Sequence, residues 1–358
     1  MDKEGRPTSR ERVALAVAHQ PTDRVPMGHV GRLYVDTLPR LESYLGVQGE
    51  DEIRERLGLD DRALRLTWQV EDADGSGKFR SLWGGVESAQ GHAAPYAAGY
   101  GPRPLRDAAT IADVETFAWP DPGDFKLEAL TPERIAQLQP FSVMGPTLPP
   151  IFCTLCELMG MDVALMNLLW APHVVEAALA RITEIVLELE RRVLDTYGVL
   201  HQIRIWDDVA DKRRMLFKPE LWRRLVRPHL AKTFALAKSR DVLVHYHCCG
   251  VMTQILPDLI DLGMDILEPC QVHLPGMEPE RLKREYGRHV TFWGAVNTQQ
   301  TLPFGTPDDV RREVRERIQV LGRDGGYVLS PDHSLMPDVP LENIVALYDE
   351  GARCGMDL

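Results

Sequence analysis

The chain has 358 residues, of which 44% are hydrophobic and 26% are charged, as is usual for a globular protein. Its formal net charge of -12 argues against nucleic acid or an anionic membrane as the main partner, because both are bound chiefly through clustered Lys and Arg. No apolar run approaches the ~20 residues of a membrane span, and the charged N-terminus lacks the core of a secretion signal, so we expect a cytoplasmic protein. The six cysteines lack regular spacing, which favours free or metal-bound thiols over a disulfide framework.

Short apolar runs alternate with longer amphipathic segments along the chain. The runs that we interpret as strands are residues 24–30, 141–146, 201–208, 241–248, 264–270, 290–296 and 326–332. Repeated alternation of strand and helix predicts a parallel sheet with right-handed crossovers. Seven candidate strands, with an eighth not identified, favour an α/β fold that is a closed (β/α)8 TIM barrel over an open doubly wound sheet.

Two of the predicted helices carry terminal signals. One begins with Thr306 as N-cap and Pro307 in the first turn, and should stop at Gly322. The other ends at Gly263, and Pro257 inside it implies a kink or a late start.

We expect one barrel domain over residues 1–358. Residues 1–140 form its N-terminal segment with the first strand, and residues 141–358 supply the remaining strands and helices. The stretch 31–140 is less regular and rich in Gly, Pro and Trp, and we expect it to cap the barrel mouth rather than form a separate domain.

Polar residues stand where many of the apolar runs finish. They are Asp207, Asp208, His247, Cys249, Glu268, Asn297, Asp332 and His333. Barrel enzymes build their active sites at the C-terminal ends of several strands, so these residues are candidates for a site. Asp207, Asp208 and Glu268 are the catalytic candidates for proton transfer or substrate contact. The alternative is that Asp207 and Asp208 cap a helix and form a salt bridge, and that Glu268 orients a ligand or caps a turn.

The stretch "LVHYHCCGV", residues 243–251, raises the question of a metal site. Residues two apart on a strand share a face, so His245, His247 and Cys249 point one way and Cys248 points the other. Positions four apart are separated by ~13 Å, which places His245 too far from Cys249 to share an ion. His247 and Cys249 therefore form the predicted half-site.

The third predicted ligand is His333, which follows the last strand and would leave one open position on a catalytic zinc. Asp332 or Asp338 would serve as a further ligand or orient an imidazole. The alternative is that His245 and Cys248 are ordinary buried residues and His247 is a hydrogen-bonded one, since Cys is among the most buried types.

Three further residues near strand ends, Gln271, Trp293 and Asn297, are candidates for substrate binding. Trp293 would alternatively fill the barrel, and His273 is expected to face solvent. The lone "CTLC" at 153–156 is interpreted mostly as packing at the start of a helix.

The chain resembles the uroporphyrinogen decarboxylase superfamily, and within it the branch of cobalamin-dependent methyltransferases. The resemblance runs nearly end to end, through "SRERVALAVAHQPTDRVPMG", "PLRDAATIADVETFAWPDP", "DD" at 207–208, "HYHCCG", "FWGAVNTQQTLPFGTPDDVRREV" and "GGYVLSPDHSLMPDVPLENIVALYD". It implies a (β/α)8 barrel, in agreement with the strand pattern.

The resemblance also implies chemistry. In thiol-methylating members a His-x-Cys and a distal Cys hold zinc, which binds a substrate thiol that takes a methyl group from a corrinoid on a partner protein. His247 and Cys249 match the first pair, whereas His333 stands in place of the distal cysteine. One thiolate and two imidazoles would leave Zn²⁺ with a net charge of +1 and temper a bound thiolate. We therefore expect a methyl-transfer partner other than a simple thiol, such as a methyl ether, a methylamine or a folate.

Two other functions stay open. A decarboxylase of tetrapyrroles is the first, but its arginine-rich signature is reduced here to Arg32 in "PMGHVGRLYVD". A ligand- or corrinoid-binding protein without turnover is the second. The sequence shows no corrinoid-binding module, so we expect any corrinoid on a separate protein, and the resemblance makes a homodimer plausible.

Overall fold

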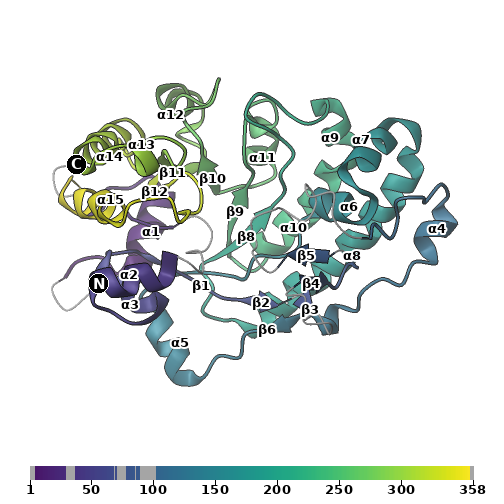
Figure 1. Cartoon of the computed structure of the whole chain (residues 1–358), viewed down its shortest axis with the longest axis horizontal. Coiled ribbons are helices and arrows are strands. Elements are labelled where there is room, and N and C mark those ends of the chain that lie inside the picture. Colours follow the sequence, from purple (N-terminus) through teal and green to yellow (C-terminus); the bar gives the residue numbers. More distant parts are fainter. Residues whose placement is uncertain are drawn as a thin grey trace.

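The computed structural model describes residues 5–29, 37–67, 69–70, 78–84, 86–88 and 102–354. Seven parallel strands form the main sheet in the order β1-β7-β8-β9-β10-β11-β12. Their bounds are β1 Asp61–Ala63, β7 Ser142–Met144, β8 Gln202–Trp206, β9 Leu243–His247, β10 Ile266–Cys270, β11 Thr291–Val296 and β12 Tyr327–Pro331. The sheet curls, and helices surround it, as in a TIM barrel (Figure 1).

The helices that surround or extend this sheet are numbered in chain order. They are α1 Ser9–Val17, α2 Thr37–Leu45, α3 Gly49–Arg56, α4 Ile111–Glu115, α5 Pro132–Leu138, α6 Ile151–Met159, α7 Met161–Trp170, α8 Pro172–Thr196, α9 Pro219–Leu225, α10 Arg227–Lys238, α11 Leu256–Asp261, α12 Pro279–Tyr286, α13 Thr301–Phe304, α14 Pro307–Leu321 and α15 Leu341–Cys354, with a 3-10 turn, η1, at Pro122–Asp124.

The predicted α/β barrel is confirmed, and six of its predicted strands form as β7 to β12. The strand not identified from the sequence is β1, three residues long, which pairs with β7. The predicted strand at 24–30, whose last residue lies outside the described part, is reduced to an isolated parallel bridge between Met27 and Leu329.

The segment around Met27 nevertheless takes the eighth place in the ring. The amide of Gly28 donates to the Leu329 carbonyl at 2.9 Å, and the Leu329 amide donates to Pro26 at 2.8 Å. On the other side, the amide of Asp60 donates to the Met27 carbonyl at 2.7 Å. These hydrogen bonds connect β12 to β1 through one short extended segment.

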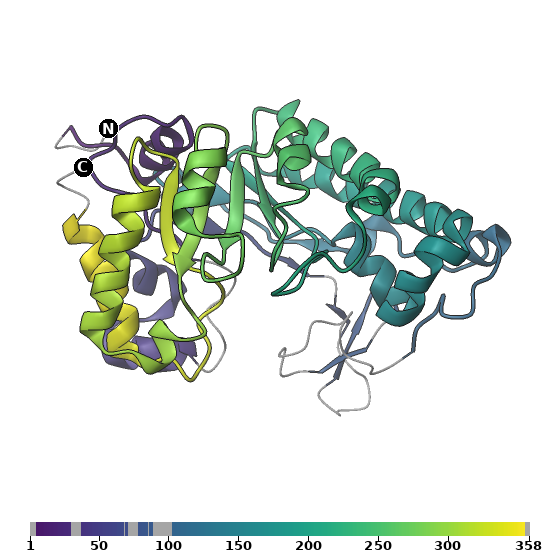
Figure 2. The ribbon, with the colours of Figure 1, turned by 90° about the horizontal axis from the view of Figure 1, so that it is seen from above.

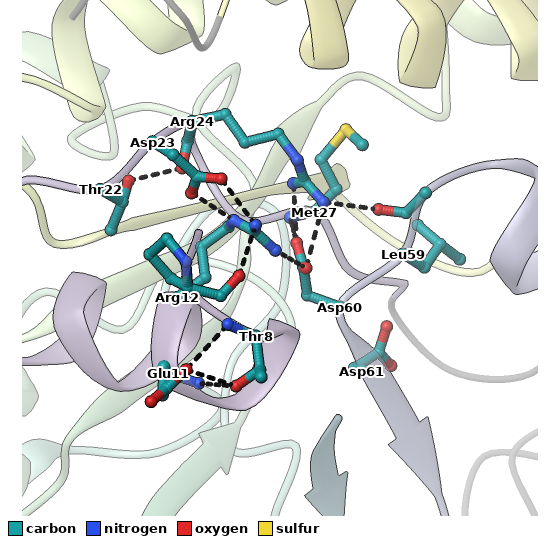
Figure 3. A network of polar contacts seen from close by, with 12 residues as sticks. Thr8, Glu11, Arg12, Thr22, Asp23, Arg24, Met27, Leu59, Asp60 and Asp61 are labelled. Carbon is teal, nitrogen blue, oxygen red and sulfur yellow. Dashed lines mark hydrogen bonds and ion pairs between the residues drawn. The ribbon is translucent and has the colours of Figure 1, made fainter. Parts of the chain in front are cut away.

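Buried ion pairs fix this segment to the start of β1 (Figure 3). The fully buried carboxylate of Asp60 lies 2.6 Å from Arg12 Nη1 and 2.7 Å from Arg24 Nη1. It also accepts the amide of Met27 at 2.8 Å, and Arg12 reaches Asp23 at 2.6 Å. A buried carboxylate is stable only when it is paired in this way, so the network stabilises the irregular eighth place.

Helix α1 covers the N-terminal end of the barrel. The guanidinium of Arg10 donates to the carbonyls of Val199, at 2.9 Å, and Leu200, at 3.1 Å, just before β8. Val13 packs in a small apolar cluster with Trp293 and two other strand residues. The barrel is therefore filled at this end, and its polar interior opens toward the C-terminal ends of the strands.

The two predicted helix signals are both found. Helix α14 has Thr306 as N-cap in a capping box with Asp309, and Gly322 follows its last turn. Helix α11 starts late, with Pro257 in its first turn. Among the described helices none is long and apolar enough to cross a membrane alone, whereas α6 and α7, bent by 105°, reach that length and composition only as a pair.

Two small antiparallel sheets lie in the N-terminal segment. One pairs β2 Leu66–Thr67 with β6 Lys126–Leu127, and the other joins β3 Gln69–Val70, β4 Lys78–Ser81 and β5 Val86–Ser88. The second sheet, in blue, stands apart from the main sheet in Figure 2. Part of this segment, including residues 71–77 and 89–101, lies outside the described residues, and both its capping role and the single barrel domain stay predictions.

Candidate metal and catalytic site

The inward faces of β8, β9 and β10 carry an unusual density of polar residues. The strand register places Arg204 beside His245, and His247 beside both Trp206 and Glu268. Because neighbouring strands are ~4.8 Å apart, side chains at one level on one face meet directly.

Three potential metal donors converge where β8 and β9 end. Ligand atoms of Asp208, His247 and Cys249 all lie within 4.8 Å of one another. His247 Nε2 is 3.6 Å from Cys249 Sγ and 4.0 Å from Asp208 Oδ1. The amide of Cys249 donates to Asp208 Oδ1 at 2.8 Å, which holds that carboxylate beside the thiol.

The electrostatics of this cluster suit a cation. Burial raises the pKa of the Cys249 thiol well above its usual value, and the nearby Asp208 carboxylate adds to the shift. A thiol and a carboxylate packed together repel as anions, and a divalent ion would offset that repulsion. One thiolate, one carboxylate and one imidazole are ordinary zinc ligands.

The predicted third ligand, His333, faces this cluster but is not among the three convergent donors. Its ring centroid lies 6.3 Å from that of His247, at an interplanar angle of 62°. Burial, with the neighbouring His247, lowers the pKa of His333, which favours a neutral imidazole. Asp208, which the sequence suggested as a catalytic carboxylate, lies beside His247 and Cys249 because β8 and β9 are adjacent strands, and His333 as a ligand stays a prediction.

The carboxylate of Glu268 lies directly behind His247. Its Oε1 is 2.7 Å from His247 Nδ1, and its Oε2 is 2.6 Å from His245 Nε2. Arg204 donates to both oxygens, from Nη2 at 2.7 Å and from Nε at 3.0 Å. Burial raises the pKa of Glu268, but Arg204 and the two histidines outweigh it and hold that pKa well below its usual value. Glu268 is therefore held as an anion beside His247, and its role in proton transfer stays a prediction.

The neighbouring carboxylate of Asp207 points elsewhere. It accepts the backbone amides of Phe152, at 2.7 Å, and Cys153, at 2.8 Å, at the start of α6. Burial raises the pKa of Asp207 to about 7, against the effect of these hydrogen bonds. Of the two predicted aspartates, Asp208 faces the metal donors and Asp207 caps a helix. The thiols of the "CTLC" motif are buried in α6 and free.

The three predicted substrate-binding residues are engaged with the protein itself. Gln271 Oε1 accepts the amide of Gly250 at 2.8 Å. Asn297 Oδ1 accepts the amide of Gln299 at 2.8 Å in a turn after β11. Trp293 is fully buried, with its ring centroid 4.9 Å from that of His245. Their role toward a substrate stays a prediction.

A second polar group lies at the end of β12. The fully buried Asp332 accepts from the Thr298 amide at 2.9 Å, and its other oxygen is 3.1 Å from His273 Nδ1. His273 is exposed as predicted, but this pairing was not foreseen. The other candidate carboxylate, Asp338, is exposed.

Arg204 is the functional candidate that the sequence interpretation missed. Alternation along "HQIRIWDD" places Arg204 on the same face as Gln202 and Trp206, inside the barrel. A charged side chain in the middle of an otherwise apolar strand was the available signal.

Comparison with known proteins identifies the family. The family model described as "Uroporphyrinogen decarboxylase (URO-D)" matches residues 88–353. The chain belongs to the URO-D family. Among solved structures, a methyltransferase from Methanosarcina mazei shares the fold of this URO-D family member, with a TM-score of 0.62, 19% identity and coverage of 97% of this chain and 99% of that one.

Curated relatives of this URO-D family member match part of its length. The "Methylcobamide:CoM methyltransferase MtaA" of Methanosarcina barkeri is 31% identical over 146 residues, which are 40% of this chain and 39% of the relative. The protein of the same name from Methanosarcina barkeri strain Fusaro is 30% identical over the same number of residues. The chain thus matches about two-fifths of the length of these relatives. The two curated relatives and the solved structure are all named as methyltransferases.

Proposed function

We propose that this URO-D family member is a zinc-dependent methyltransferase that exchanges a methyl group with a methylcobamide carried by a separate protein. The observation that carries the proposal is the convergence of Asp208, His247 and Cys249 within 4.8 Å at the ends of two adjacent strands. The relatives named as methylcobamide:CoM methyltransferases support the same chemistry.

The chain's own residues suit this role. Asp208, His247 and Cys249 would hold the ion, and His333 faces them from just past the end of β12. Zinc bound there would lower the pKa of a substrate thiol or water. Glu268 keeps Nδ1 of His247 engaged, so that Nε2 is the ring atom presented to Cys249.

The net charge of the zinc ion and its ligands affects which kind of methyl acceptor the site favours. The expectation of an acceptor other than a thiol rested on two imidazoles and one thiolate, with a net charge of +1. With Asp208 in the set, the carboxylate and the thiolate of Cys249 together neutralise a divalent ion. A neutral site leaves a bound sulfur more electron-rich than a cationic site does. We therefore infer that the acceptor is a thiol, of which CoM is the first to test.

Purified full-length protein with methylcobalamin and CoM tests the proposal. We expect loss of the methylcobalamin absorbance in the presence of zinc-loaded protein, and at least tenfold slower loss with Cys249→Ala. A small alkyl thiol and an alkylamine as alternative acceptors distinguish a thiol acceptor from an amine. Conversion of uroporphyrinogen, or binding of methylcobalamin without turnover, would contradict the proposal and support one of the two alternatives.

A further inference from the structure

A continuous chain of polar side chains runs through the barrel below the candidate metal site. Ser142 Oγ is 2.8 Å from His201 Nδ1 and accepts from Gln202 Nε2 at 3.0 Å. Gln202 Oε1 is 2.8 Å from His245 Nδ1, and His245 Nε2 is 2.6 Å from Glu268 Oε2. This series of contacts therefore extends from His201, near the end of the barrel that α1 covers, to Glu268, which contacts the predicted zinc ligand His247.

Gln202 connects Ser142 to His245 within this series of polar contacts. Its side chain is fully buried, as are Ser142, His245 and Glu268, so solvent does not supply replacement partners. Its amide oxygen contacts His245 and its amide nitrogen donates to Ser142, and within the described part of the chain each has that one side-chain partner. The hydrogen bond between His245 Nδ1 and Gln202 Oε1 sets the orientation of the ring, which then presents Nε2 to Glu268 Oε2 at 2.6 Å.

The orientation of His245 matters because of what it contacts. Glu268 Oε2 is shared by His245 and Arg204, and Oε1 is shared by His247 and Arg204. If His245 turned away, Oε2 would lose one of its two partners and the plane of the carboxylate would be less constrained. The contact from Oε1 to His247 would then be less well aligned with the donors Asp208 and Cys249.

We propose that Gln202 is a positioning residue for the metal site, which fixes His245 and through it the Glu268 carboxylate that orients His247. This inference rests on the proposed function, since it assumes that His247 is a metal ligand. Removing a direct partner of a metal-bound histidine usually weakens metal binding about 10- to 100-fold. Gln202 reaches His247 only through His245 and Glu268, so we expect its removal to weaken metal binding less, about three- to tenfold.

Metal affinity of the full-length protein tests the inference without any assay of activity. The substitution Gln202→Met keeps a similar volume and removes both hydrogen bonds, whereas Gln202→Glu keeps an oxygen that accepts from His245. The control is Ile266→Val, which removes a buried methylene from the apolar cluster below Glu268. The dissociation constants of Zn²⁺ and Co²⁺ are measured by competition with a chelator, and the Co²⁺ spectrum reports the ligands.

We expect a three- to tenfold higher dissociation constant and an altered Co²⁺ spectrum for Gln202→Met, with Gln202→Glu and Ile266→Val within about twofold of the wild type. An unchanged dissociation constant for Gln202→Met, or an equal loss for Ile266→Val, would overturn the inference alone. Absence of metal binding by the wild type would overturn the proposed function as well. If Gln202→Met does not fold, Ser142→Ala removes the other partner of Gln202: weaker metal binding supports the inference, and wild-type affinity overturns it.

Discussion

Nδ1 of His247 and Oε1 of Glu268 lie 2.7 Å apart in the interior of the barrel. The carboxylate is fully buried, and Arg204 and His245 hold its pKa low, so it remains an anion that accepts from the imidazole. The substitution Glu268→Gln keeps the shape of the side chain but removes its charge. We expect a 10- to 100-fold higher Zn²⁺ dissociation constant, measured by chelator competition. The control is the exposed Glu280→Gln, and an unchanged constant for Glu268→Gln would contradict this assignment.

The adjacent aspartates after β8 provide a matched pair of variants. Asp208→Asn retains an oxygen to accept the Cys249 amide but removes the charge from the donor set, so we expect metal affinity to fall at least about tenfold with little change in stability. Asp207→Asn leaves only one oxygen for the two amides at the start of α6, so it should cost about 1–2 kcal/mol of stability. The metal affinity of Asp207→Asn should remain within about threefold of the wild-type value. Metal titration and urea unfolding of both variants check the pair, and an exchange of the two phenotypes would refute the separate roles.

The sequence alone predicted some of these site residues and not others. Alternation within "LVHYHCCGV" predicted that His247 and Cys249 share a face, because that is a local property of a strand. Which partner lies opposite depends on the register between strands, so the contacts of Asp208 and Arg204 could not be assigned from spacing, although alternation places Arg204 inside the barrel. Strand β1 was missed because its two charged residues, Asp61 and Arg62, are buried through ion pairs with α3, such as that of Asp61 with Arg54.

His201, at the lower end of the polar chain, makes stability depend on pH. Burial, with the charge of Arg10, lowers its pKa from 6.5 to about 4. The folded state thus binds a proton less readily than the unfolded state. The stabilisation is complete above pH 6.5 and is lost as the pH falls from 6.5 to about 4. We expect the free energy of unfolding to decrease by up to roughly 3 kcal/mol over this window and the decrease to be smaller in His201→Gln.

Urea unfolding at several pH values measures this dependence. The exposed His289→Asn is the control, and its pH profile should follow the wild type. Other partly buried histidines contribute in the same direction, such as His229, whose pKa burial also lowers to about 4. The free energy of unfolding of His201→Gln should therefore depend less on pH than that of the wild type, but should still depend on it. A profile of His201→Gln that matches the wild type would exclude His201 as a source of the dependence.

The Asp60 network should contribute strongly to stability. Asp60→Ala leaves Arg12 and Arg24 without their shared buried partner and removes the acceptor of the Met27 amide. Breaking a buried ion pair on one side costs about 3–5 kcal/mol. We expect a loss of that size in urea unfolding, against a negligible change for the exposed Asp107→Ala. A loss below about 1 kcal/mol would show that the eighth place of the barrel is held by its backbone hydrogen bonds alone.

Gly28 and Trp293 pack too closely to admit a side chain at position 28. A Cβ atom built on Gly28 would lie 2.1 Å from Cζ2 of Trp293, and the indole is fully buried against the cluster below the site. Overpacking of this kind costs about 1–3 kcal/mol, so we expect Gly28→Ala to lower the free energy of unfolding by that amount. Trp293→Leu alone leaves a cavity and should destabilise by about 3 kcal/mol or more. In the double variant the methyl group occupies part of that cavity, so the two losses should fall short of additivity by about 1 kcal/mol or more. Strict additivity in urea unfolding would mean that the strain at Gly28 does not come from the indole.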